Sequence, residues 1–143
     1  MASSGMASSA VPYSNVTTLL AMLIGAYVAA AGLGGLLDPE RWRRVLADFT
    51  GSPVLGLISG VVAFVIGGAI IGVHGRWDSP LAIIVSLVGW IALAEGFVLI
   101  AFGDWWVRFT MPLSSQPRLW GGFALLVGAG LFIAGVAGRT ALL

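Results

Sequence analysis

A carboxylate, Glu95, stands in the middle of the mostly apolar run GWIALAEGFVLIAFGDWW at residues 89–106. An ionised acidic side chain at the centre of a lipid-facing helix costs about 3 kcal/mol on insertion scales. We therefore expect Glu95 to face other helices as a protonated or hydrogen-bonded carboxyl. Ser59 is a second polar side chain at a similar expected depth.

Three roles are open to Glu95: a structural carboxyl, a salt bridge to a partner subunit or to an interfacial Arg, and a proton or ion relay. A relay needs several polar groups in series, and Glu95 is the one acidic or basic residue within the expected hydrocarbon region. This favours the structural role and leaves a small proton- or ion-coupled transporter or channel as the alternative.

His74 is the one histidine of the chain, and it precedes Arg76, Trp77 and Asp78 at the end of an apolar segment. A lone interfacial His is typically solvated or hydrogen-bonded. It could bind a haem, another pigment or a metal, but the chain has no second His and no Cys to complete a site. We therefore expect no cofactor, no metal and no catalytic residue, and a protein that is not an enzyme.

The composition indicates an integral membrane protein. Hydrophobic residues make up 59% of the 143 and charged residues 9%, against about 25% charged in soluble domains. The net charge of +1 does not indicate nucleic-acid binding. All seven cations are Arg, and this, with the abundant Ala and Gly, favours a bacterial source.

Four segments are long and apolar enough to cross a bilayer, which takes about 20 residues of helix. They cover residues 16–37, 54–73, 81–102 and 119–137. They lack the period-two alternation of barrel strands, so the expected class is an all-α membrane protein. Residues 1–15 are expected to form a mobile tail, and 16–143 a four-helix transmembrane domain.

The first connection, DPERWRRVLADFTGSP, predicts a short amphipathic helix over 39–49 that lies in the headgroup plane. Asp38 can cap it and Pro39 can begin it. Its apolar residues Trp42, Val45, Leu46 and Phe49 share one face. The third connection is also rich in aromatic residues. The expected interfacial residues are Trp42, Arg43, Arg44, Trp77, Trp105, Trp106 and Arg108.

The two halves of the chain are related. GVHGR at 72–76 and GVAGR at 135–139 are 63 residues apart, while the Trp–Pro pairs 42/53 and 106/117 are 64 apart. We expect two duplicated helical hairpins with interfacial connectors, in parallel orientation. Small residues at four-residue spacing predict close packing within the protein or between copies. The expected packing glycines are Gly34, Gly67, Gly68, Gly72, Gly130 and Gly138.

Arg residues set the expected orientation. Five of them (Arg41, Arg43, Arg44, Arg108 and Arg118) lie in the first and third connections. Because cytoplasmic loops carry an excess of positive charge, these connections are expected in the cytoplasm and both termini in the periplasm. The expected location is the bacterial inner membrane.

The string HGRWDSPLAIIVSLVGWIALAEGFVLI resembles a pattern in small, uncharacterised bacterial membrane proteins with four helices. The matching positions are His74, Trp77, Gly89, Trp90, Glu95 and Gly96. The charged position is often Lys in such proteins, so Glu95 is a departure that argues against a strict acidic relay. The resemblance implies a fold and no activity.

These observations favour a non-enzymatic accessory, structural or assembly subunit of a membrane complex, or a homo-oligomer. Its expected partners are the lipid bilayer and other membrane subunits or further copies of itself, with no nucleic acid. A pigment- or haem-binding subunit using His74 is the weaker alternative.

Overall fold

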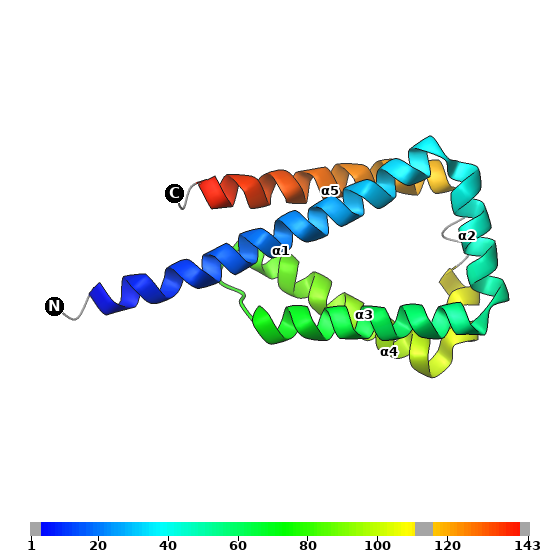
Figure 1. Cartoon of the computed structure of the whole chain (residues 1–143), viewed down its shortest axis with the longest axis horizontal. Coiled ribbons are helices and arrows are strands. Elements are labelled where there is room, and N and C mark those ends of the chain that lie inside the picture. Colours follow the sequence, from blue (N-terminus) through cyan, green and yellow to red (C-terminus); the bar gives the residue numbers. More distant parts are fainter. Residues whose placement is uncertain (1–3, 111–115, 141–143) are drawn as a thin grey trace.

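Helices make up nearly all of the described structure. The computed structural model describes residues 4–110 and 116–140, with side chains described over 15–103, 105–110 and 116–140. Figure 1 shows the five helices and their order. They are α1 Ser4–Leu37, α2 Pro39–Gly51, α3 Pro53–Val73, α4 Pro80–Thr110 and α5 Pro117–Thr140.

The expected all-α membrane class is confirmed. Four stretches are long and apolar enough to span a bilayer: Asn15–Leu37, Pro53–Val73, Pro80–Gly103 and Pro117–Thr140. The chain is therefore a multi-pass helical membrane protein. Because α1 begins at Ser4, residues 4–15 are helical and continue the first span. The mobility expected of this tail stays a prediction.

The first connection forms the expected helix. Asp38 leaves the helical conformation at φ −137° and ψ 75°, and its carboxylate accepts a hydrogen bond from the Arg41 backbone N–H at 2.9 Å. Trp42 is half-buried, with its indole over Gly34, and Leu46 and Phe49 are half-buried on the same side. Val45, which was expected on this face, is exposed. In Figure 1, α2 runs across the ends of the membrane helices, as an interfacial helix would.

The second half repeats this break without a separate helix. Phe102 is non-helical at φ −131° and ψ 19°, and α4 then continues to Thr110. Asp38 and Phe102 are 64 residues apart, so each repeat changes direction at the same position. Residues 111–115 of the third connection lie outside the described part of the chain.

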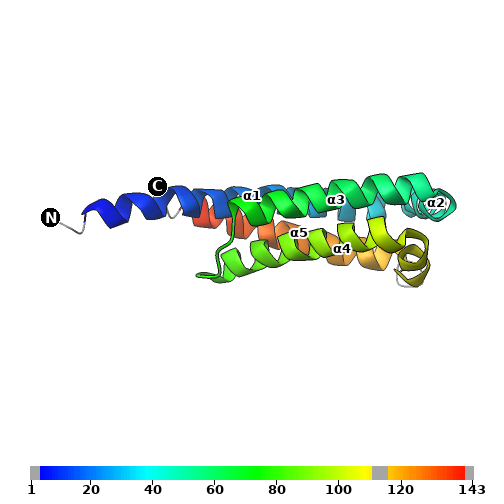
Figure 2. The same cartoon turned by 90° about the horizontal axis from the view of Figure 1, so that it is seen from below.

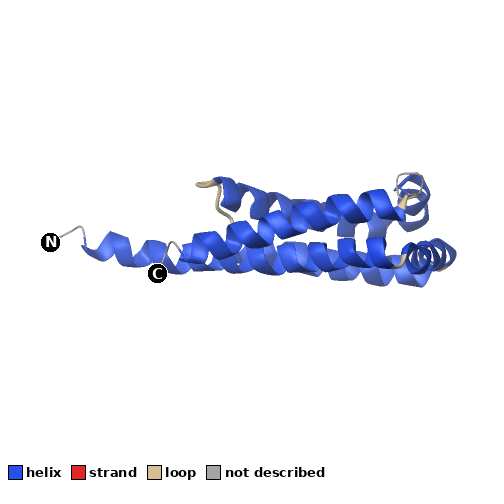
Figure 3. Cartoon of the chain, turned by 90° about the horizontal axis from the view of Figure 1, so that it is seen from above, coloured by secondary structure: helices blue, strands red, loops and turns tan. Residues whose placement is uncertain are grey.

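The membrane helices pack as two antiparallel pairs, α1 with α5 and α3 with α4. Each pair therefore joins one helix from each predicted hairpin, and the described residues of α1 and α3 make no extended contact. Seen from the side, α1 and α3 lie in one layer and α4 and α5 in another (Figures 2 and 3). The pairs converge near the start of α4 and separate toward α2 (Figure 1).

Glycines seven residues apart let the backbones of each pair touch. In one pair, a Cβ on Gly32 would lie 2.4 Å from the backbone N of Leu125. In the other, a Cβ on Gly96 would lie 2.3 Å from the backbone N of Phe64. The seven-residue glycine pairs are Gly25/Gly32, Gly60/Gly67, Gly89/Gly96 and Gly121/Gly128. Small residues hold membrane helices together in this way because van der Waals contact replaces the missing hydrophobic drive.

These contacts correct the alignment of the repeats. The packing glycines of α1 and α4 are 64 residues apart, but those of α3 and α5 are 61 apart. The GVHGR and GVAGR strings are thus not equivalent: Gly72 meets nothing within 4 Å, whereas a Cβ on Gly135 would meet Met22 and Thr18. The cause is that α5 begins one turn closer to its packing glycines than α3 does.

The expected packing glycines divide into two groups. Gly67 and Gly138 face close neighbours, and Gly34 faces Trp42. Gly72 and Gly130 meet nothing within 4 Å, and Gly68 meets only the side chain of Leu93 at 3.7 Å. The rows at four-residue spacing therefore predicted only some of the true contacts. In an antiparallel helix pair the same face returns to the contact every seven residues.

Candidate functional site

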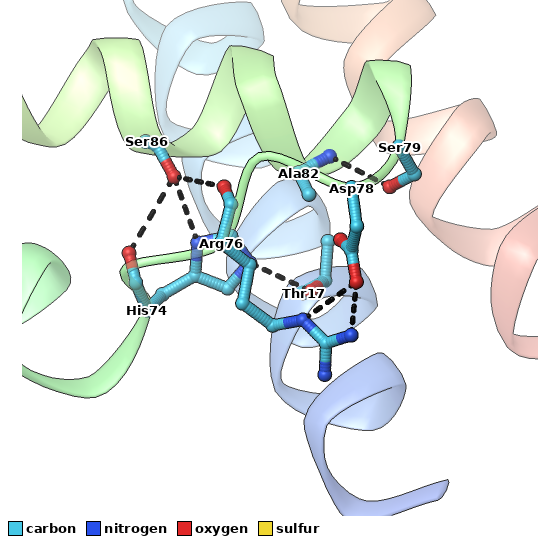
Figure 4. A network of polar contacts seen from close by, with 7 residues as sticks. All are labelled: Thr17, His74, Arg76, Asp78, Ser79, Ala82 and Ser86. Atoms are coloured by element: carbon cyan, nitrogen blue, oxygen red, sulfur yellow. Dashed lines mark hydrogen bonds and ion pairs between the residues drawn. The ribbon is translucent and has the colours of Figure 1, made fainter. Parts of the chain in front are cut away.

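A buried polar network joins three helices where the pairs converge. His74 caps the end of α3 and is 2% exposed. Its Nε2 lies 2.6 Å from Thr17 Oγ1 of α1, and its Nδ1 lies 3.2 Å from Ser86 Oγ of α4. Figure 4 shows the ring between these two hydroxyl groups. One imidazole thus ties α3 to a helix of each pair.

The hydrogen bonds of Ser86 indicate which ring nitrogen carries a proton. The Ser86 hydroxyl donates to the carbonyl O of Arg76 at 2.7 Å, so it acts as acceptor toward the ring. We assign the proton of a neutral His74 to Nδ1, which donates to Ser86, while Nε2 accepts from Thr17. A protonated ring would instead donate to Thr17, because a hydroxyl can both donate and accept.

The short loop between α3 and α4 is fixed by its own polar groups. Ser79 Oγ accepts from the backbone N–H of Ala82 at 3.2 Å and so caps α4. The Arg76 guanidinium pairs with the Asp78 carboxylate, with Nε 2.9 Å from Oδ2. This hydrogen bond lowers the pKa of Asp78 below its usual value. The loop therefore positions His74 with little freedom.

An apolar core lies beneath the network. One buried residue from each membrane helix contributes to it: Ala21, Ile70, Val85 and Leu131. Leu20, Ile24 and Leu81 pack against this core from α1 and α4. All four spans thus meet at this end, and the network with its core holds the two pairs together.

The geometry of His74 favours a structural role. Both ring nitrogens have hydroxyl partners, so a haem iron or metal would have to displace one of them. Among the described residues, no group of three His, Cys, Asp or Glu side chains could hold a metal ion. The solvated or hydrogen-bonded histidine expected from the sequence is a hydrogen-bonded one.

The position of Glu95 differs from the one expected. It was expected to face other helices, but its side chain is exposed, and it makes no hydrogen bond or ion pair with a described residue. The neighbouring Gly96 takes the position that faces α3. Glu95 lies 100° further round the helix.

The exposure of Glu95 follows from the separation of the pairs. Leu81, Val88 and Glu95 are seven residues apart, so they form one line along α4. Leu81 packs against the core and Val88 is half-buried, while Glu95 is exposed. Phe102, seven residues further, is 59% exposed. The side chains along this line become more exposed as α4 diverges from α1 and α5.

The other predicted site residues lie near the ends of the helices, apart from Ser59. Ser59 is half-buried on α3. Trp105 stacks on Phe109 with ring centroids 5.7 Å apart, and Trp77 is 52% exposed in the loop. Arg43 pairs with Glu40 at 3.1 Å on the surface of α2. Arg44, Trp106 and Arg108 lie on α2 or on the last turns of α4.

Sequence reasoning missed Thr17, Ser86 and most of the packing glycines. The glycines carry a usable signal, because each of the four spans contains the same seven-residue glycine spacing. Thr17 and Ser86 carry none, since single hydroxyl residues in apolar helices do not reveal what they face. Comparison with protein-family models, with curated proteins and with solved structures found no match to this chain.

Proposed function

We propose that this protein is a non-enzymatic accessory or assembly subunit of a complex in the bacterial cytoplasmic membrane. The observation that carries this proposal is the exposed Glu95 carboxyl within the third span, which has no partner among the described residues. Acidic side chains in membrane helices are rare, and almost all of them face a protein interior or a water-filled cavity. A further subunit would supply the protein surface that this chain lacks around Glu95.

The shape of the chain supports the same proposal. Its pairs meet at one end and separate toward α2 (Figure 1), and along α4 the side chains change from packed at Leu81 to exposed at Glu95 and Phe102. Partner helices can pack on such a face without a rearrangement of the helix pairs. A relay through Glu95 has less support, because no second acidic or basic side chain lies near the middle of the described spans.

Native mass spectrometry after extraction in mild detergent tests the subunit proposal. We expect the protein to be recovered with at least one other membrane protein at a fixed ratio. Recovery as a lipid-bound monomer from its native membrane, under conditions that preserve known complexes, would contradict the proposal.

The orientation is a separate part of the proposal. The Arg residues of α2 favour a cytoplasmic position for this helix and a periplasmic position for the loop at 74–79. Gly75 and Ala47 are both exposed, and the chain has no Cys of its own. In intact spheroplasts, a membrane-impermeant thiol reagent should label Gly75→Cys and spare Ala47→Cys. The opposite pattern would reverse the orientation.

A further inference from the structure

We propose that Glu95 is the docking point for a transmembrane helix of a different protein, one that carries a Lys or Arg side chain at the depth of Glu95. This rests on the proposed subunit function and names the chemistry of the partner. The docked helix lies between α1 and α4, on the side where the helix pairs separate.

The repeat defines the two walls of this docking surface. The line Leu81, Val88, Glu95 on α4 is matched by Thr17, Ile24 and Ala31 on α1, each 64 residues earlier. At the converging end both lines are occupied: Thr17 is buried against His74, and Leu81 packs on the core. Beyond Ile24 and Val88 the two helices diverge (Figure 1), and the position that holds Glu95 on α4 holds the small Ala31 on α1.

The α1 wall is hollowed beside Ala31. A hollow of about 310 Å³ lies next to it, lined by small residues together with two indole rings. Its lining includes Ala31, Gly32, Gly35, Trp42, Trp120 and Gly121. Gly32, Gly35 and Gly121 are in contact across the α1–α5 pair, so the open space lies beside Ala31 and the indole of Trp42. Glu95 supplies the one charged side chain of the α4 span.

The charge of Glu95 identifies the occupant as a basic helix from another chain. Glu95 lies eight residues before the end of its span at Gly103, which is about 12 Å along the helix. A partner cation at that depth would stabilise the carboxylate, because opposite charges attract strongly where water is scarce. The seven Arg of this chain lie in the connections or at span ends, so a second copy offers no cation there.

A synthetic helix tests the proposal directly. The probe is a single-span Leu/Ala-rich peptide with one Lys at the depth of Glu95, and its control has Leu at that position. Each is reconstituted with the full chain in phosphatidylcholine vesicles, and binding is followed by energy transfer between dyes. We expect the Lys peptide to bind about tenfold more tightly than the Leu peptide, and Glu95→Gln to remove this preference.

A matched variant tests whether the carboxylate must stand at position 95 or need only be present at this depth. Ala94 is exposed and lies 100° round the helix from Glu95 at almost the same depth. The double variant Ala94→Glu/Glu95→Gln keeps the charge but turns it away from α1. We expect it to show no preference for the Lys peptide. Equal preferences in the wild type, Glu95→Gln and the double variant would overturn the proposal.

Two further outcomes keep this proposal distinct from the subunit function. If the native complex forms and survives Glu95→Gln unchanged, the docking proposal fails and the subunit function stands. If dye-labelled copies of the chain associate with each other and Glu95→Gln abolishes this association, the occupant is a second copy and the proposal of a basic partner is overturned. Thermal unfolding of each variant in detergent confirms that it folds.

Discussion

The two ends of the helix bundle differ in whether their polar side chains are buried and have hydrogen-bond partners. At the converging end, His74 is buried and both of its ring nitrogens have partners on other helices. Near the diverging end, Glu95 is exposed and makes no hydrogen bond with a described residue. The first arrangement is complete within one chain and serves stability. We propose that the second is completed by another molecule.

The largest expected effect concerns the helix pairs on which both ends depend. A side chain at Gly128 would run into the backbone of α1 at Ala29, whereas Gly130 on the same helix meets nothing within 4 Å. We expect Gly128→Leu to destabilise the protein by about 3 kcal/mol or to prevent folding, as overpacking does. Gly130→Leu is the matched control and should unfold like the wild type in thermal scans in detergent.

His74→Ala should weaken the converging end. It removes a buried ring and leaves the hydroxyl groups of Thr17 and Ser86 without that partner. We expect a loss of about 1–3 kcal/mol. Cysteine pairs that report the distance between α1 and α4 should also show the pairs opening. A His74→Ala protein as stable as the wild type would show that the apolar core alone holds this end.

Trp42 tests whether α2 braces the diverging end. Its indole is half-buried over Gly34, while the Arg43 side chain is 61% exposed. Trp42→Asp should lower the thermal stability in nanodiscs by the equivalent of about 1–3 kcal/mol, since it removes an aromatic contact and adds a charge at the interface. Arg43→Ala should change it by less than about 0.5 kcal/mol, as is usual at the surface. Equal effects would mean that α2 does not pack on α1.

We expect Glu95→Leu to affect the stability of the isolated chain in the opposite way to His74→Ala. Because Glu95 makes no contact that one chain needs, the isolated monomer should keep or slightly increase its thermal stability. The same variant should reduce recovery of the native complex. A monomer destabilised as much as by His74→Ala would show that Glu95 belongs to the fold, and the contrast between the two ends would fail.

The smallest effect concerns the loop at the converging end. Arg76 lowers the pKa of Asp78 in the folded protein, so the ion pair adds stability above the unfolded pKa of about 3.9. That contribution is lost as the pH falls through the lower, folded pKa. Asp78 is exposed, so the change is small. Asp78→Asn should flatten the acid limb of the stability curve below pH 4, and an unchanged acid limb would contradict the role of this pair.

Much of the architecture could be read from the sequence because it depends on local composition. The spans, the amphipathic connector and its cap at Asp38 follow from runs of apolar residues and from side chains that bond within one turn. The duplication was also visible, but its alignment in the second half was not. A shift of one helical turn leaves composition unchanged and alters only which face meets the neighbouring helix.

The sequence by itself determined that this chain crosses a membrane four times, because hydropathy is a sum over neighbouring residues. Only the tertiary structure decided that α1 pairs with α5, that Thr17 and Ser86 hold His74, and that Glu95 is left uncovered. Each of these depends on the direction of one helix relative to another. In lipid that direction is set by close backbone contact at a few glycines, which no local property of the sequence specifies.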